Sequence, residues 1–210
     1  MRFFIALALT MALPAASAWA AVTATIASSS TSLTNAGGTV TMTVSMSGDA
    51  GEVLNGYDFY YDISDVDLNA TMNANTGPVV ISNWQNLAPT NLTIFTPNVP
   101  AGVSGDFGFT GSTNFIGGTP NPLPLAGGAD LFSFDATFAP NTSGSDITHD
   151  FVFNVPATLF GLRINGAVFD KNQVAYTNTA VTVSAVPEPS SLSLVALAGC
   201  GAALRRRQRA

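Results

Sequence analysis

The stretch 39-TVTMTVSMS-47 alternates between polar and apolar residues without a break. Val40, Met42, Val44 and Met46 share one face of an extended chain, and threonines and serines share the other. Because successive side chains of a β-strand point to opposite sides of the sheet, a period of two residues predicts a strand with one buried and one solvated face. No segment in the middle of the chain shows a convincing helical period, so this stretch decides the fold class of the domain.

The same alternation recurs through the middle of the chain. It predicts buried faces for further strands, whose apolar sets are Val22, Ala24 and Ile26; Tyr57, Phe59, Tyr61 and Ile63; Phe132, Phe134 and Phe138; Phe151, Phe153 and Val155; and Phe160, Leu162 and Ile164. Additional strands are expected at 78–82, 91–95, 106–110 and 180–186. Clusters of Gly, Asn, Pro, Ser and Asp between them are typical of turns. Many short strands separated by turns predict an all-β, antiparallel sandwich or barrel.

The first twenty residues differ from this middle part. Arg2 gives a positive start, an apolar core runs over residues 3–17, and Ala18 and Ala20 place small side chains where a signal peptidase reads them. We expect a secretory signal peptide that is cut after Ala20. The domain that follows, residues 21–185, is long enough to bury a core of its own.

The charge of that domain is strongly negative. The whole chain carries a formal charge of −6, but between residues 21 and 185 only Arg163 and Lys171 stand against twelve acidic residues, which gives −10. Such a surface repels phosphate backbones, so no nucleic-acid partner is expected. The single cysteine, Cys200, lies outside the domain, which therefore has no disulfide and no thiolate metal site.

Four segments occur in an order that carries a resemblance. The segment “VTMTVSMSG” is followed by “EVLNGYDFYYDISDVDLN”, then by “ADLFSFDATFAPNTSGS” and “LFGLRINGAVFDKNQVAYTNTAVTVS”. Together they span most of residues 23–183 and resemble the cohesin-like and related carbohydrate-binding β-sandwich family. The resemblance implies a jelly-roll-like sandwich of about nine strands. It leaves open whether such a domain binds a carbohydrate, such as exopolysaccharide, or docks a protein.

The sequence offers little for catalysis. Its only histidine, His149, stands beside Asp150 and is interpreted as a solvated turn residue. No Gly-x-Ser-x-Gly motif is present, and no two acidic residues stand out as the catalytic pair that glycoside hydrolysis requires. The Gly- and Pro-rich segment 117–128 lacks a lysine to hold phosphate, and we expect a long exposed loop there, either a binding element or a tolerated insertion. No enzyme and no cofactor are therefore expected.

Two groups of residues are candidates for binding. Trp84, in “SNWQN”, and Tyr60, on the polar face of its strand, are candidate platforms for stacking a sugar, although a structural role at the sandwich edge is favoured for Trp84. Asp62, Asp65 and Asp67 in “DISDVD” supply oxygen ligands at a spacing that suits calcium. They lack the Gly and the distal Glu of an EF-hand loop, so a solvated turn is favoured over a calcium site.

The chain closes with a second export-related pattern. Its first part is the motif Val186, Pro187, Glu188 and Pro189, which we expect to be stiff and extended because each proline fixes φ and lacks an N–H group. An apolar segment follows at 191–204, shorter than the roughly 20 residues of a membrane-spanning helix. A basic cluster comes last, made of Arg205, Arg206, Arg207 and Arg209. The positive-inside rule keeps such a cluster cytoplasmic, so the domain is expected outside, tethered to the inner membrane by a short transmembrane helix.

This order of motif, apolar segment and basic cluster resembles the PEP-CTERM sorting signal of Gram-negative bacteria. The resemblance implies recognition of residues 186–189 and cleavage by an exosortase, in the setting of exopolysaccharide and biofilm matrix. The sequence “LAGC” at 197–200 does not count as a lipoprotein box, because that box ends an N-terminal signal. We therefore expect an exported, non-enzymatic protein of the cell surface or extracellular matrix, with signal peptidase and exosortase as transient partners.

Overall fold

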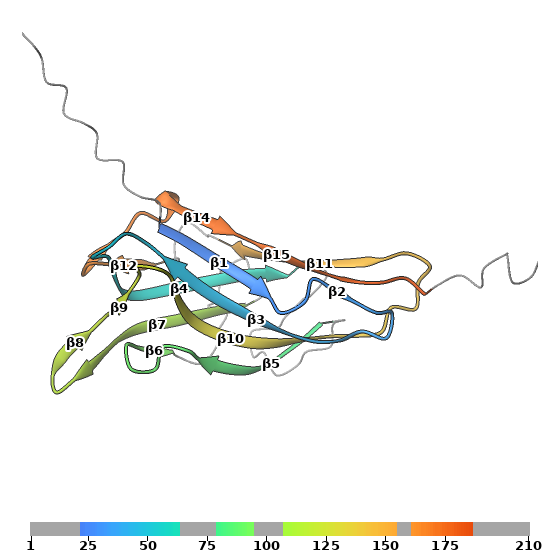
Figure 1. The fold of residues 1–210 in the computed structure, drawn as a ribbon, viewed down its shortest axis with the longest axis horizontal. Helices are drawn as coiled ribbons and strands as arrows, with labels where there is room; N and C mark the ends of the chain where they lie inside the picture. Colours follow the sequence, from blue (N-terminus) through green and yellow to red (C-terminus); the bar gives the residue numbers. More distant parts are fainter. Residues whose placement is uncertain (1–21, 64–78, 95–106, 155–160, 187–210) are drawn as a thin grey trace, which may run out of the picture.

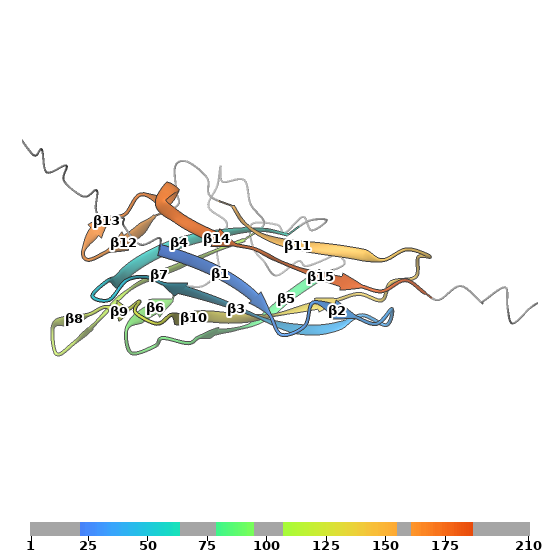
Figure 2. The same cartoon turned by 45° about the horizontal axis from the view of Figure 1, so that its top comes forward.

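The computed structural model describes residues 22–63, 79–94, 107–154 and 161–186, which form a sandwich of two β-sheets (Figures 1 and 2). The smaller sheet has the strand order β14 (Val174–Thr177), β1 (Val22–Ser28), β3 (Gly38–Ser47), β10 (Ala129–Phe138) and β5 (Val79–Asn86). Its neighbouring strands run antiparallel, except that β14 is parallel to β1. The all-β sandwich predicted from the period-two pattern is confirmed.

The larger sheet is built around β4 (Val53–Ile63). Along one edge β4 pairs with β11 (Ile147–Asn154) and β12 (Leu162–Ile164), and along the other with β7 (Phe107–Ile116) and β9 (Leu123–Pro124). The sheet is extended by β15 (Thr179–Val183), β2 (Ser32–Leu33), β13 (Ala167–Val168), β6 (Leu92–Ile94) and β8 (Thr119–Asn121). The described parts hold more strands than the sequence predicted, because several edge pairings are only two or three residues long. A 3-10 turn, Lys171–Gln173, precedes β14.

The apolar faces predicted from the alternation meet between the two sheets. In β3, Val40, Met42, Val44 and Met46 are all buried. The predicted sets of β1, β4 and β10, and the described members of those of β11 and β12, are buried in the same way. Two expected members, Val155 and Phe160, lie outside the described residues. The alternation therefore predicts correctly which face of each central strand is buried.

Aromatic rings bridge the two sheets. The ring centroid of Phe132 in β10 lies 4.3 Å from that of Phe109 in β7 and 6.0 Å from that of Tyr57 in β4. The ring centroid of Phe134, also in β10, lies 6.4 Å from that of Phe151 in β11. Such large buried side chains contribute strongly to the core of a domain that has no disulfide.

The Gly- and Pro-rich segment 117–128 is exposed over most of its length, as the sequence predicted, but it is not a plain loop. It contains β8, which pairs with the end of β7, and β9, which pairs with β4. Leu123 is 9% exposed and Leu125 is fully buried. Only the expectation of a loop without strands was wrong, because it rested on glycine and proline content, whereas two leucines among the prolines anchor the segment to the core.

His149 also departs from its expected place. It lies in β11, only 3% exposed, with its ring centroid 5.3 Å from that of Phe138. Its Nδ1 is buried and has no hydrogen-bond partner in the described part of the chain. The assignment to a solvated turn is therefore wrong. His149 has the inward phase of Phe151 and Phe153, so the period-two pattern itself predicts its burial.

The side chains of Asn141 and Asp146 hold the end of the last strand, β15, and we call this pair the clasp. The buried amide of Asn141 donates hydrogen bonds to the carbonyl oxygens of Val183 and Ser184, each at 3.1 Å. The Ala185 N–H donates to Asp146 Oδ1 at 2.7 Å. Figures 1 and 2 show β15 ending at the opposite end of the sandwich from β8, β9 and β13. The sequence that follows β15 therefore departs from a firmly held point.

Candidate binding site

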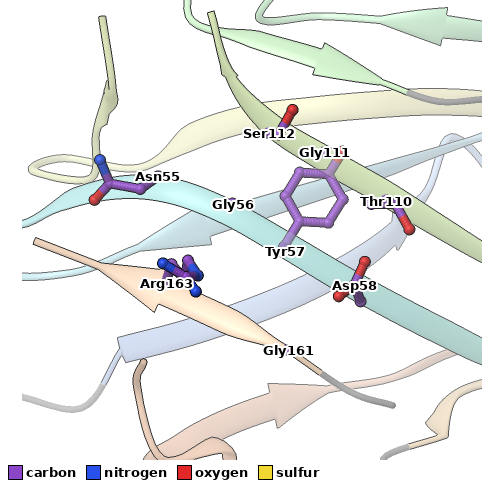
Figure 3. A pocket seen from close by; sticks show the side chains of 9 residues that line it. All are labelled: Asn55, Gly56, Tyr57, Asp58, Thr110, Gly111, Ser112, Gly161 and Arg163. Atoms are coloured by element: carbon purple, nitrogen blue, oxygen red, sulfur yellow. The ribbon is translucent and has the colours of Figure 1, made fainter. Parts of the chain in front are cut away.

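A small hollow opens on the outer face of the larger sheet, where β4 runs between β7 and β12 (Figure 3). We call it the β4 hollow. Its volume is about 220 Å³. Its lining residues are Asn55, Gly56, Tyr57, Asp58, Thr110, Gly111, Ser112, Gly161 and Arg163.

The register of the three strands places polar side chains around a glycine. Gly56 pairs with Ser112 of β7 on one side and with Arg163 of β12 on the other. Asp58 lies two residues further along the same face of β4 and pairs with Thr110. A glycine inside a strand leaves room for another group to approach the backbone, so the centre of this polar ring is open.

Several polar side chains of the hollow form no hydrogen bond with other described residues of the protein. Within the described ranges, the carboxylate of Asp58, the hydroxyls of Thr110 and Ser112 and the guanidinium of Arg163 form no hydrogen bond or ion pair. Asn55 is partly engaged, because its Oδ1 accepts from the Gly166 N–H at 2.6 Å. The hollow thus presents both donors and acceptors to a ligand.

Tyr57 forms the base of the hollow. Its side chain is 2% exposed and leans across Gly111, where any Cβ would overlap the ring. Burial raises the pKa of the Tyr57 phenol far above its ordinary value, and the negative charge of Asp58 adds to the shift. The phenol is therefore neutral at physiological pH, and its buried oxygen has no hydrogen-bond partner among the described residues.

A second recess lies beside the β12–β13 hairpin, and we call it the β13 groove. Its volume is about 520 Å³. Val168, on the edge strand β13, is 77% exposed there, and Phe169 lies next to it. Glu52 and Asp170 also line the groove. The β13 groove therefore combines apolar surface with negative charge.

Trp84, a predicted sugar platform, packs against the core instead of standing free. Its ring centroid lies 4.3 Å from Phe109 and 4.9 Å from Phe134. A bulge causes this, because Asn83 adopts a left-handed φ of 52° and the pairing of β5 with β10 shifts there. The contacts support the structural role that was favoured from the sequence.

The other predicted binding residues do not come together either. Tyr60 points away from the inter-sheet core but is only 5% exposed, so it offers little ring surface for stacking a sugar. Asp62 is exposed on β4, whereas Asp65 and Asp67 lie outside the described residues. No group of His, Cys, Asp or Glu that would hold a metal ion occurs among the residues that the structure describes.

The residues predicted for export and sorting fall almost entirely outside the described ranges. This holds for Ala18 and Ala20, for Pro187, Glu188 and Pro189, and for Arg205, Arg206, Arg207 and Arg209. Val186 is the last described residue and is 38% exposed. Among the described segments, no helix has the length and apolarity to cross a membrane.

The β4 hollow was missed in the sequence, although two signals pointed to it. Gly56 interrupts an otherwise alternating strand in “VLNGYDF”, which is typical of a bulge or of a close approach to the backbone. Arg163 is one of only two basic residues between positions 21 and 185. The pairing of β7 and β12 with β4 was needed to bring these signals together.

No protein-family model matches the chain, and no curated protein sequence matches it. Its structure is similar to the third cohesin of ScaC from Acetivibrio cellulolyticus, solved in complex with the ScaB dockerin: TM-score 0.51, 10% identity, over 78% of this chain and 99% of that one. The second type II cohesin of ScaA from the same organism gives a TM-score of 0.49 and 11% identity over 80% and 98% of the two chains. The seventh ScaB type I cohesin of Pseudobacteroides cellulosolvens gives 0.48 and 12% over 80% and 96%. The implied fold is confirmed by the first of these structures: the chain is a cohesin-like β-sandwich.

Proposed function

We propose that this chain is an exported, non-enzymatic docking module that holds a protein partner at the cell surface or in the extracellular matrix. The observation that carries the proposal is the cohesin-like sandwich, since a protein of similar fold was solved in complex with a dockerin. The tail that resembles a PEP-CTERM signal begins directly after the last strand of this sandwich. Signal peptidase and exosortase are the partners of the export route, and the inner membrane is its temporary anchor.

The β13 groove is the surface that best suits a protein partner. Val168 is the most exposed of the large apolar side chains in the described residues, and it lies on the edge strand of the larger sheet. Edge strands offer unpaired backbone groups to an added strand. Because Glu52 and Asp170 flank the groove, a partner segment with alternating apolar and basic residues fits its chemistry.

Site-specific photo-crosslinking in the native host tests the docking function. A crosslinking residue at position 168 should capture one defined surface protein, whereas the same residue at Val80, 39% exposed on the smaller sheet, should not. The captured protein is then purified, and its affinity is measured for the wild-type chain and for Val168→Glu. Loss of binding in Val168→Glu but not in Val80→Glu supports docking at the groove. Unchanged binding in both variants would remove the groove from the proposal.

A carbohydrate-binding function is the second candidate. It is favoured by the β4 hollow, whose uncommitted carboxylate, guanidinium and hydroxyl groups match the hydrogen-bonding groups of a sugar. The two candidate sites share no lining residue, although Arg163 of the hollow pairs with Val168 of the groove across β12 and β13. Binding of each ligand is therefore measured separately.

A further inference from the structure

We propose that the β4 hollow binds a single neutral sugar unit of a glycan, held between Asp58 and Arg163. This inference goes beyond the docking function and does not depend on it. It also moves the sugar site away from Trp84 and Tyr60, whose rings are packed against or covered by other parts of the protein.

Two opposite charges line the hollow. Asp58 and Arg163 line the same hollow, yet they form no ion pair with each other or with another described residue. A carboxylate only accepts hydrogen bonds and a guanidinium only donates them. A sugar hydroxyl does both, so adjacent hydroxyls of one ring can donate to Asp58 and accept from Arg163.

The charges of the hollow and of the whole domain favour a neutral ligand. An anionic ligand would gain from Arg163 but would face Asp58 and a domain whose formal charge is −10. A cationic ligand would gain from Asp58 but would meet Arg163 inside the same small hollow. A neutral polyol avoids both penalties and still uses both groups in charge-assisted hydrogen bonds.

The size of the hollow and the buried Tyr57 ring at its base limit what can bind. A volume of about 220 Å³ is smaller than a site for a drug-sized ligand, so one ring of a longer glycan fits better than several. Gly56 lets that ring approach the backbone, and the hydroxyls of Thr110 and Ser112 stand beside it. The Tyr57 ring is too buried to serve as a stacking platform. Recognition therefore rests on hydrogen bonds, and the dissociation constant for one unit should be on the order of 1–10 mM.

The exported protein is tested by NMR with methyl α-glucopyranoside, methyl α-mannopyranoside, methyl β-galactopyranoside and the anionic methyl glucopyranosiduronate. Saturation-transfer difference spectra detect binding, and amide shifts locate it. We expect at least one neutral glycoside to bind and to shift the amides of Gly56, Ser112 and Gly161. The uronate should bind more weakly than its neutral counterpart.

Variants separate the hollow from other surfaces. Asp58→Asn and Arg163→Gln should each weaken binding by roughly tenfold or more, because each removes a charged hydrogen-bond partner. Asp62→Asn on the same strand and Lys171→Gln make the same charge changes outside the hollow and should leave binding unchanged. Equal losses in these controls, or binding that is lost in Trp84→Phe, would overturn the assignment.

Two further outcomes would also overturn the proposal. One is a wild-type protein that gives no saturation transfer with any of the neutral glycosides. The other is a wild-type protein whose hollow shows no amide shifts with the glycosides, while Arg163→Gln no longer binds the protein partner captured through position 168. In that case the hollow belongs to the docking surface rather than to a sugar.

Discussion

At the scale of single residues, one backbone conformation decides where Trp84 points. Val79 and Ile81 face the core in alternation, so a regular strand would turn residue 84 outward. Asn83 lies at a φ of 52° and inserts a bulge, which returns Trp84 to the core beside Phe134. Asparagine tolerates this left-handed region better than most residues, which explains its presence there.

Replacing Asn83 tests this account. Asn83→Val should destabilise the fold by about 1–2 kcal/mol, because a β-branched residue is strained at positive φ. Asn83→Gly is the control, since it relieves the strain and loses only the hydrogen bond from Asn83 Nδ2 to Asp135 Oδ2 at 2.9 Å. Trp84 is the only tryptophan outside the first twenty residues, so its emission reports on the site. A red shift in Asn83→Val that is absent in Asn83→Gly is expected; identical spectra and urea midpoints would contradict the role of the bulge.

Two neighbouring residues of β10 test the division between the faces. Phe134 is fully buried, so Phe134→Ala should lower the free energy of unfolding by about 3–5 kcal/mol. Asp135 faces outward and accepts hydrogen bonds from Thr41 Oγ1 at 2.8 Å and from Asn83. Its replacement by alanine should cost only about 1 kcal/mol. Urea unfolding of both variants checks the difference, and equal losses would mean that the assignment of the faces is wrong.

At the scale of elements, the turn between β10 and β11 fastens the end of β15. The Asn141 side chain reaches the carbonyl oxygens of Val183, Ser184 and Ser145, and its own Oδ1 accepts from the Ser143 N–H at 2.8 Å. A buried amide with all its hydrogen bonds made rigidifies the segments that it joins. The clasp thus defines where the folded domain stops.

Asn141→Ala should loosen this clasp. We expect a loss of about 1–3 kcal/mol, because buried carbonyl groups are left without a donor. Hydrogen exchange of the Ala185 amide should accelerate more than that of amides in β3. Asn172→Ala, in the exposed 3-10 turn, removes a side-chain hydrogen bond to Asp170 and serves as the control. An unchanged exchange rate at Ala185 would show that the chain end is held without Asn141, by Asp146 and by the backbone hydrogen bonds of Ser184 and Val186.

At the scale of the whole molecule, the sequence predicted the buried face of each strand better than it predicted which distant strands pair. The set from Val40 to Met46 and the buried aromatic residues follow from period two, which reports on immediate neighbours along the chain. The β4 hollow could not be predicted in this way, because Gly56, Ser112 and Arg163 become neighbours only through register. The strands within segment 117–128 were missed for a related reason, since they are short pieces whose partners lie elsewhere in the sequence.

The tyrosines give the whole fold a dependence on alkaline pH. Burial raises the pKa of all four, Tyr57, Tyr60, Tyr61 and Tyr176, above the value of an exposed tyrosine. In the unfolded chain they ionise near pH 10, whereas the folded protein keeps them neutral to higher pH. The stabilisation that comes from keeping these tyrosines neutral is therefore fully present below about pH 10, and it is lost as the pH rises further. Absorbance at the tyrosinate band should stay flat until unfolding begins. Ionisation of these tyrosines near pH 10 in the folded protein would contradict their burial.

The tail follows β15 in the sequence, and β15 ends opposite β8 and β13. Because the fold holds the chain through Val186, whose N–H donates to the Ser143 carbonyl oxygen at 3.1 Å, removal of the sequence beyond it should leave the domain intact. Protein extracted from the cell surface should lack Arg205 and the residues after it by intact mass, with an unchanged urea midpoint. Glu188 is the only charge in the motif at 186–189, so Glu188→Gln should leave the unprocessed form in the inner membrane. Ser190→Ala, which leaves the motif intact, should be processed normally. A full-length chain at the surface of a host that has an exosortase, or normal delivery of Glu188→Gln, would show that the tail is not read as a sorting signal.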